Sequence, residues 1–211
     1  MSDQLRVSCR CNTVKGYVAV GDLSAVPRYV CHCDDCQAFI RYLGRAEDVL
    51  DRWGGTEVVH VTPASLHLES GRDHLRCLNL SGGGTLRWFA ACCGSPIGST
   101  PKSPGFPFVS LVSTFIRDTP EKMSIGPVRG RLMLKYAYGD VAPLRKDSLS
   151  AFRMFLGVAR SILIERLFRR HRTTPFFLPG TSSPISPPHA LTAQEREQAY
   201  GALSAGNGGT A

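Results

Sequence analysis

Short apolar segments alternate with turn-forming residues along the chain as far as Tyr138. The segments KGYVAV, EVVHV, SLHLE, LRCLNL, TLRWFAA and FPFVSLVST are rich in β-branched and aromatic residues, and Gly, Pro and Asp lie between them. This spacing predicts a mainly β fold with antiparallel strands. The Gly-rich stretch SGGG separates two of the segments. Because glycine takes positive φ without strain, we expect residues 75–91 to form a hairpin.

Helical spacing replaces this alternation in the segment QAFIRYLG, residues 37–44. Its apolar residues Phe39, Ile40 and Leu43 suit one or two helical turns. Gly44 ends the segment, and glycine is a common residue just past the end of a helix.

The chain changes character after Pro143. Apolar residues recur at three- and four-residue intervals over residues 148–172, which predicts an amphipathic helix. Residues 173–189 contain too much Pro and Ser to be regular, and Thr192 with Glu195 forms the capping box of a short last helix. We therefore expect a β domain over residues 1–143 and a helical, Pro- and Ser-rich C-terminal extension over residues 144–211.

Composition favours one soluble domain with a tail. The chain has 211 residues, of which 43% are hydrophobic, and that is enough to bury one core. The sequence shows no signal peptide and no apolar segment long enough to cross a bilayer, so we expect a cytoplasmic protein. The net charge of +8 suits acidic partners, but by itself it describes only solubility and electrostatic field.

The eight cysteines are the strongest chemical signal. In a reducing cytosol they would not persist as disulfides, so their close spacing points to metal or redox chemistry. In CHCDDC, residues 31–36, Cys31 and Cys33 can face one side of a strand while Cys36 returns on a turn. Zinc binds thiolates at about 2.3 Å, usually four in a tetrahedron, so three thiolates leave one ligand unassigned.

The fourth ligand has two interpretations. Water or substrate occupies this position in catalytic zinc sites, which keep it open. Alternatively, His32, Asp34 or a distant cysteine closes the site. The spacing alone does not choose between them.

A second set of cysteines is more widely separated. Cys9 and Cys11 near the start, and Cys92 and Cys93 at the end of the predicted hairpin, can form a four-sulfur structural site. Neighbouring side chains on a strand point to opposite faces, so we expect Cys93 to be a ligand and leave Cys92 undecided.

Two other groups of possible metal ligands are not assigned to a metal site. Cys77 is alone in an apolar strand, where a small buried thiol belongs to the core. His60, His67 and His74 recur every seven residues, but an odd spacing alternates faces on strands, so we do not expect them to share a metal.

The order of the motifs SCRC, CHCDDC and RWFAACCGSPI resembles the glutathione-dependent formaldehyde-activating enzyme and centromere protein V zinc-domain family. The resemblance covers roughly residues 7–119 and implies a mainly β, tent-like fold with two zinc sites. By this resemblance, the site with catalytic potential is formed by Cys31, Cys33 and Cys36. The structural site is formed by Cys9, Cys11 and Cys93.

The chain departs from this family at Ala90, which stands where the family usually has the first cysteine of Phe-Cys-x-x-Cys-Gly. Either Cys92 takes the place of that cysteine, or the structural zinc is weak or absent. The departure affects stability first, because a structural zinc contributes folding free energy.

The resemblance implies a carbon-sulfur lyase that captures formaldehyde with glutathione and gives S-hydroxymethylglutathione. Zinc lowers the pKa of a bound thiol, and the thiolate then attacks the carbonyl carbon, so no protein nucleophile is required. Three arginines flank the cysteine motif and are candidates for binding the glutathione carboxylates: Arg28, Arg41 and Arg45.

The alternative function is a non-catalytic, zinc-stabilised binding module. The predicted amphipathic helix ends in a basic cluster suited to nucleic acid or an anionic membrane surface. That cluster consists of Arg166, Arg169, Arg170, His171 and Arg172. We favour the simpler interpretation, in which the apolar stripe packs on the β domain and the arginines suit the negative end of the helix dipole.

Overall fold

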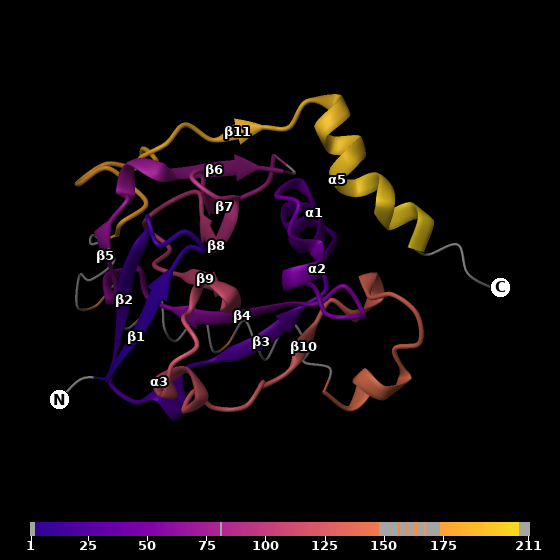
Figure 1. The fold of residues 1–211 in the computed structure, drawn as a ribbon, viewed down its shortest axis with the longest axis horizontal. Coiled ribbons are helices and arrows are strands. Elements are labelled where there is room, and N and C mark those ends of the chain that lie inside the picture. The colour runs from indigo at the N-terminus through magenta and orange to yellow at the C-terminus, as the bar shows by residue number, and fades with distance from the viewer. Residues whose placement is uncertain are drawn as a thin grey trace.

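The computed structural model describes residues 3–80, 82–147 and 174–206, together with Leu156, Ala159, Leu163 and Leu167 (Figure 1). Within these residues the chain forms eleven strands in two sheets, and a helix lies near its C-terminus. The predicted mainly β fold is therefore confirmed.

The larger sheet has eight strands in the order β10-β3-β4-β9-β8-β7-β6-β11. Its interior neighbours are antiparallel, whereas β10 and β11 pair in parallel at the two edges. The predicted hairpin is present as β6 and β7, with Leu75 opposite Ala90. The strands are β3 (Arg28–Cys31), β4 (Thr56–Val61), β6 (Leu75–Asn79), β7 (Thr85–Ala90), β8 (Ser95–Pro101), β9 (Val109–Val112), β10 (Arg131–Leu132) and β11 (His189–Ala190).

The smaller sheet is antiparallel and has the order β1-β2-β5. Its strands are β1 (Asp3–Ser8), β2 (Lys15–Val20) and β5 (Leu66–Ser70). Gly16 in β2 has no room for a side chain, since a Cβ there would lie 1.9 Å from the carbonyl oxygen of His67. The glycine therefore permits the close approach of β2 to β5.

One apolar core contains residues of both sheets, including Leu5 of β1 and Trp88 of β7. The C-terminal extension enters this core, because Phe176 and Phe177 are buried in it and the ring of Phe176 lies 4.9 Å from that of Trp88. Residues 174–190 are irregular apart from β11 and short turns, as their Pro and Ser content predicts. They nevertheless pack as part of the β domain.

Two helices lie side by side at one end of the larger sheet (Figure 1). The first, α1 (Asp34–Tyr42), begins three residues before the predicted helix and ends before Gly44, whose φ is 65°. The second, α5 (Ala193–Gly206), starts at the predicted capping box: the Thr192 and Glu195 side chains each accept a hydrogen bond from the other residue's backbone N–H. Ile40 of α1 and Ala199 of α5 are buried in one small apolar cluster.

The remaining helical segments are short. They are α2 (Ala46–Val49), α3 (Pro120–Met123) and the 3₁₀ turns Leu23–Ala25, Pro63–Ser65, Arg72–His74, Ser113–Phe115, Leu134–Tyr136 and Ala142–Asp147. No helix in the described part of the chain is long and apolar enough to cross a membrane.

The amphipathic helix predicted over residues 148–172, with its basic end, lies outside the described residues except at four positions. Leu156, Ala159, Leu163 and Leu167 are helical there. The three leucine side chains are exposed, so at these positions the stripe does not pack on the β domain as we expected.

Replacing Phe176 by Ala tests whether the C-terminal extension stabilises the β domain. We expect the free energy of unfolding to fall by about 3–5 kcal/mol, because the change leaves a cavity beside Trp88. Leu178→Ala is the matched control in the same segment, since Leu178 is exposed and its loss should cost less than about 1 kcal/mol. If chemical denaturation shows that Phe176→Ala lowers the free energy of unfolding as little as Leu178→Ala does, the extension does not contribute to the core.

Candidate metal centres

The first candidate centre is a three-cysteine cluster formed by Cys31, Cys33 and Cys36, whose sulfur atoms all lie within 4.8 Å of one another. Cys31 is the last residue of β3, and Cys33 is the N-cap of α1, where its sulfur accepts the N–H of Cys36 at 3.4 Å. The prediction that Cys31 and Cys33 share a strand and that Cys36 returns on a turn is therefore wrong in part. Cys33 is not on the strand, and Cys36 lies in the first turn of α1. The strand ends at Cys31, the last residue of β3 to pair with β4, and the helix starts immediately afterwards.

None of the three residues considered for the fourth ligand joins this cluster. The ring of His32 points elsewhere, with Nδ1 3.2 Å from the carbonyl oxygen of Trp53 and Nε2 3.3 Å from Nη1 of Arg131. Asp34 accepts the backbone N–H of Asp35. Cys77 is the one cysteine outside the two clusters, and its thiol lies in the core, 3.3 Å from the carbonyl oxygen of Ser186. Among the described residues, the possible metal ligands here are the three sulfurs.

A buried arginine contacts the three-cysteine cluster. Arg87 of β7 donates a hydrogen bond from Nη1 to the sulfur of Cys36 at 3.3 Å and another to Ser99 Oγ at 2.8 Å. Its Nη2 lies 3.9 Å from Oδ2 of Asp35. Arg87 was not predicted as a site residue, and its only signal in the sequence is one cation within the apolar segment TLRWFAA.

These contacts favour a thiolate at Cys36. Hydrogen bonds from Cys31 and Cys33, together with the positive charge of Arg87, hold the pKa of Cys36 well below its usual value. In turn, hydrogen bonds to Cys33 and Cys36 raise the pKa of Cys31. Since zinc binds thiolates, occupation of the cluster releases protons that the free cluster retains.

A cavity of about 280 Å³ adjoins the three-cysteine cluster, and Cys31 and Cys36 form part of its wall. His60 also lines it, and its ring centroid lies 4.7 Å from that of Tyr29 and 4.5 Å from that of Phe108. Burial lowers the pKa of His60 to about 4. This histidine is therefore neutral at pH 7. The other lining residues are Phe39, Thr56, Val58, Thr85, Arg87, Ser99, Phe108, Ser110, Val112 and Leu132.

The three arginines predicted to bind glutathione do not line this cavity. Each has a partner elsewhere. Arg28 pairs with Glu57 at 2.9 Å, Arg41 donates to the hydroxyl of Tyr138, and Arg45 pairs with Asp48 at 2.6 Å. A role for them in binding glutathione stays a prediction.

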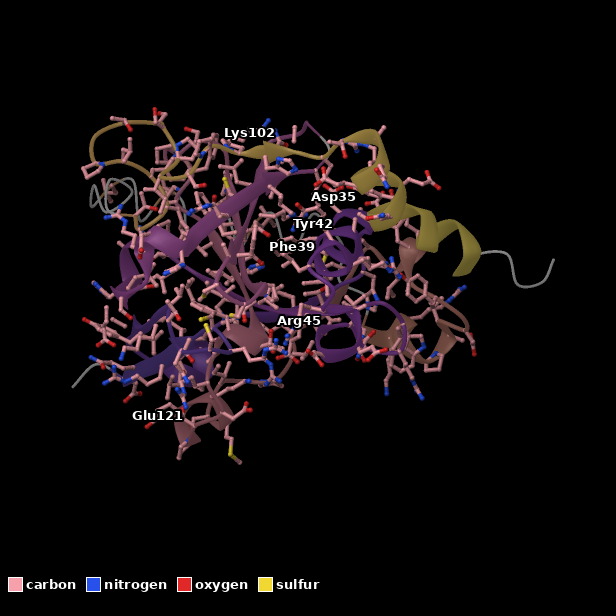
Figure 2. All side chains as sticks on the ribbon, turned by 45° about the horizontal axis from the view of Figure 1, so that its top comes forward. Asp35, Phe39, Tyr42, Arg45, Lys102 and Glu121 are labelled. Carbon is pink, nitrogen blue, oxygen red and sulfur yellow. The ribbon has the colours of Figure 1, made fainter. Side chains whose placement is uncertain are left out.

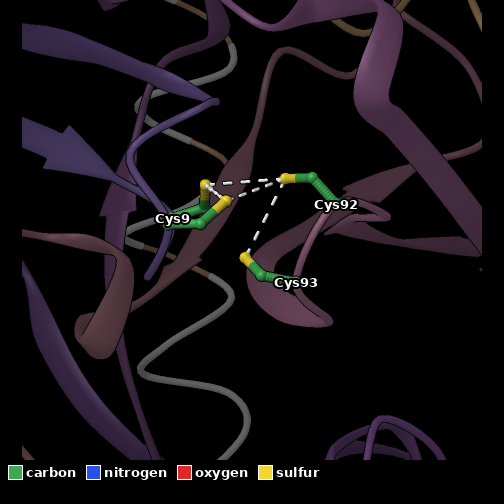
Figure 3. Close-up of side chains that lie close together, drawn as sticks. Cys9, Cys92 and Cys93 are labelled. Carbon is green, nitrogen blue, oxygen red and sulfur yellow. Dashed lines mark hydrogen bonds between the residues drawn. The ribbon is translucent and has the colours of Figure 1, made fainter.

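The second candidate centre is a four-cysteine cluster formed by Cys9, Cys11, Cys92 and Cys93 (Figure 3). The sulfur of Cys92 lies 3.4 Å from that of Cys11, 3.8 Å from that of Cys9 and 3.9 Å from that of Cys93. Both pairs lie in turns, one between β1 and β2 and the other between β7 and β8. Cys92 and Cys93 are therefore not on a strand, and adjacent side chains in a turn can approach the same point.

In the four-cysteine cluster it is Cys92, and not residue 90, that supplies the fourth sulfur. Ala90 is fully buried at the end of β7, and Cys92 lies among the other three sulfurs. Hydrogen bonds from Thr13 lower the pKa of Cys11 to about 6, so one sulfur of this cluster is ionised at neutral pH. The backbone N–H of Val14 donates to the sulfur of Cys9 at 3.3 Å.

The chemistry of both clusters fits zinc. Soft sulfur donors gathered around one point are the donor set that zinc prefers, and four of them make a closed structural site. In both clusters a backbone N–H also donates to a ligand sulfur, which stabilises the thiolate form that binds metal.

Neither cluster of possible metal ligands in the described part of the chain includes His60, His67 or His74. His67 stacks on Tyr17 at 4.9 Å, whereas His60 lies at the cavity. The place of His60 at the cavity was not predicted.

Comparison with known proteins gives a family without an assigned function. A model described as "Family of unknown function (DUF6151)" matches residues 1–184. The chain belongs to the DUF6151 family. The DUF6151 match includes both cysteine clusters and ends before α5. No curated protein matches the chain.

One solved structure similar to this DUF6151 protein is the crystal structure of a Rhodobacter sphaeroides protein, which is 16% identical in sequence. The similarity covers 59% of this chain and 99% of that chain, with a TM-score of 0.40.

Replacing Cys92 by Ala tests the four-cysteine cluster. If both clusters bind zinc, metal analysis of the purified wild-type protein gives two zinc ions per chain, and the variant should retain one. Cys77→Ala is the control, because it removes a cysteine that lies in neither cluster and should leave two. A Cys92→Ala protein that keeps two zinc ions would contradict the assignment of Cys92.

Proposed function

We propose that the protein is a zinc-dependent enzyme of the carbon-sulfur lyase class, which forms or cleaves a thiol-aldehyde adduct such as S-hydroxymethylglutathione. The observation that carries this proposal is the position of the three-cysteine cluster, two of whose residues line a cavity of about 280 Å³. A closed structural site would need a fourth protein ligand, and the described residues supply none.

A zinc ion bound by the three sulfurs would supply a Lewis-acidic position that lowers the pKa of a substrate thiol and orients it. The protein residues have simpler roles. Arg87 lines the cavity and offers positive charge to the aldehyde oxygen, which becomes negative as the carbon-sulfur bond forms. Phe39, Val58 and Phe108 are apolar lining residues that limit the water around that oxygen.

The size and lining of the cavity restrict which part of a substrate can enter it. Apart from Arg87 and the cysteine cluster itself, no lining side chain carries a charge at pH 7, since the pKa of His60 is lowered to about 4. The two charged carboxylates of glutathione are therefore best placed outside, with only the sulfur, the adduct carbon and its oxygen inside. Smaller, less polar thiols and aldehydes fit the same cavity.

The resemblance of SCRC, CHCDDC and RWFAACCGSPI to the glutathione-dependent formaldehyde-activating and centromere protein V zinc-domain family supports this proposal. We also propose, on the same resemblance, that the sheets form a tent-like fold. Placement in the cytoplasm belongs to the proposal as well, because thiolate ligands need a reducing compartment.

A second candidate function is the non-catalytic zinc-stabilised binding module. One observation favours it: Leu156, Leu163 and Leu167 are exposed, and an exposed apolar stripe suits a partner or a membrane surface. The cavity beside the three-cysteine cluster favours the enzyme.

An assay of S-hydroxymethylglutathione formation distinguishes the two functions. We expect zinc-loaded wild type to exceed the spontaneous rate, measured by exchange NMR of formaldehyde and glutathione, and Cys33→Ala to fall to the rate without protein. Cys77→Ala, a change in the core and outside both clusters, should keep the wild-type rate. Equal rates for folded wild type, Cys33→Ala and the protein-free sample would rule out this activity and leave the binding module.

A further inference from the structure

The C-terminal helix α5 lies beyond residues 1–184, the part of the chain that the DUF6151 model matches. It nevertheless packs on α1, whose first turn carries Cys36. Asp35 and Tyr42, labelled in Figure 2, lie on the side of α1 near α5. The helix outside the family match therefore contacts the element that forms the three-cysteine cluster.

Continuous polar contacts lead from α5 to the cluster. The hydroxyl of Tyr200 in α5 donates to Oδ1 of Asp35 at 2.5 Å. The other carboxylate oxygen of Asp35 lies 3.9 Å from Arg87 Nη2. Nη1 of Arg87 donates to the sulfur of Cys36 at 3.3 Å.

Arg87 and Asp35 are charged groups that lie largely away from water, so their interaction depends strongly on their relative position. The Arg87 side chain is 11% exposed and that of Asp35 is 24% exposed, so water screens their charges poorly. A buried cation needs partners that hold it in one place. Burial and the neighbouring Asp35 carboxylate raise the pKa of Tyr200, so the tyrosine keeps the proton that it donates.

We propose that Tyr200 is a positioning residue for the three-cysteine cluster. It fixes Asp35, and Asp35 keeps the Arg87 guanidinium against the sulfur of Cys36. The inference rests on metal binding at this cluster, which is part of the proposed function, but not on the lyase activity.

The net charge of the metal centre is the reason why we expect the position of Arg87 to affect metal affinity. Three thiolates around Zn²⁺ carry one net negative charge, and a guanidinium at the ligand sulfur offsets it. Groups that contact metal ligands typically change metal affinity by about 10–100-fold. Tyr200 acts through one more residue, so we expect its loss to weaken metal binding by about 3–10-fold.

Two tyrosine hydroxyls bridge α1 and α5, which gives a matched pair of variants. Tyr200 reaches Asp35, whereas Tyr42 of α1 donates to Glu195 of α5 at 3.3 Å. Tyr200→Phe and Tyr42→Phe each remove one oxygen and one contact between the same helices. Only the first change interrupts the contacts that lead to Arg87.

The experiment is a Co²⁺ titration of the full chain, in which the sulfur-to-cobalt charge-transfer absorption reports on the ligand sulfurs. The four-cysteine cluster contributes equally to both variants, so their difference spectrum isolates the other site. We expect Tyr200→Phe to weaken one of the two binding phases by about 3–10-fold and to shift its absorption band. Tyr42→Phe should leave both unchanged.

An Asp35→Asn background distinguishes positioning from a general loss of helix packing. If Tyr200 acts through Asp35, Tyr200→Phe should add no further weakening in that background. Equal effects of Tyr200→Phe and Tyr42→Phe, or full additivity with Asp35→Asn, would overturn the inference while leaving the proposed function intact. A wild-type chain that binds no metal at the three-cysteine cluster would overturn both.

Discussion

The close approach of three cysteine sulfurs, all within 4.8 Å of one another, is the constraint on which this structure depends. Three thiolates at that separation repel one another strongly unless a cation lies among them. The protein supplies one cation, Arg87, in hydrogen-bonding contact with Cys36, and the cluster has the donor set for a second, a metal ion. The end of β3, the N-cap of α1 and the buried position of Arg87 in β7 all serve this arrangement.

The four-cysteine cluster has a different consequence for the fold. It joins the turn between β1 and β2 to the turn between β7 and β8, and so links the two sheets. Cys11 and Cys92, whose sulfurs are in contact, are 81 residues apart in the sequence. A metal ion that joins such distant segments removes chain entropy from the unfolded state and adds its binding free energy to folding. This cluster is suited to stability, whereas the three-cysteine cluster faces a cavity and is suited to chemistry.

Local patterns in the sequence predicted local structure well. The hairpin of β6 and β7, the helix that ends before Gly44 and the capping box at Thr192 depend on neighbouring residues, and all three are present. The spacing of Cys33 and Cys36 is compatible with both a turn and a first helical turn, so it did not reveal that Cys33 caps a helix.

Features that depend on distant pairing were not predictable in this way. Arg87 of β7 contacts Cys36 of α1 although the two residues are 51 positions apart in the sequence, and no short-range pattern encodes that contact. His60 of β4 lines the cavity beside Phe108, which is likewise distant in the sequence. Phe176 joins the core from a Pro- and Ser-rich segment, and that composition gives no sign of burial.

The most direct test of a metal site open to substrate is a thiol titration of the Co²⁺-loaded full chain, followed by absorption spectroscopy. An open position at the three-cysteine cluster should accept a small thiol such as 2-mercaptoethanol. The sulfur-to-cobalt absorption should then rise and saturate at one thiol per chain. A spectrum that stays unchanged while both clusters hold cobalt would mean that the protein itself fills the fourth position, and would contradict the account.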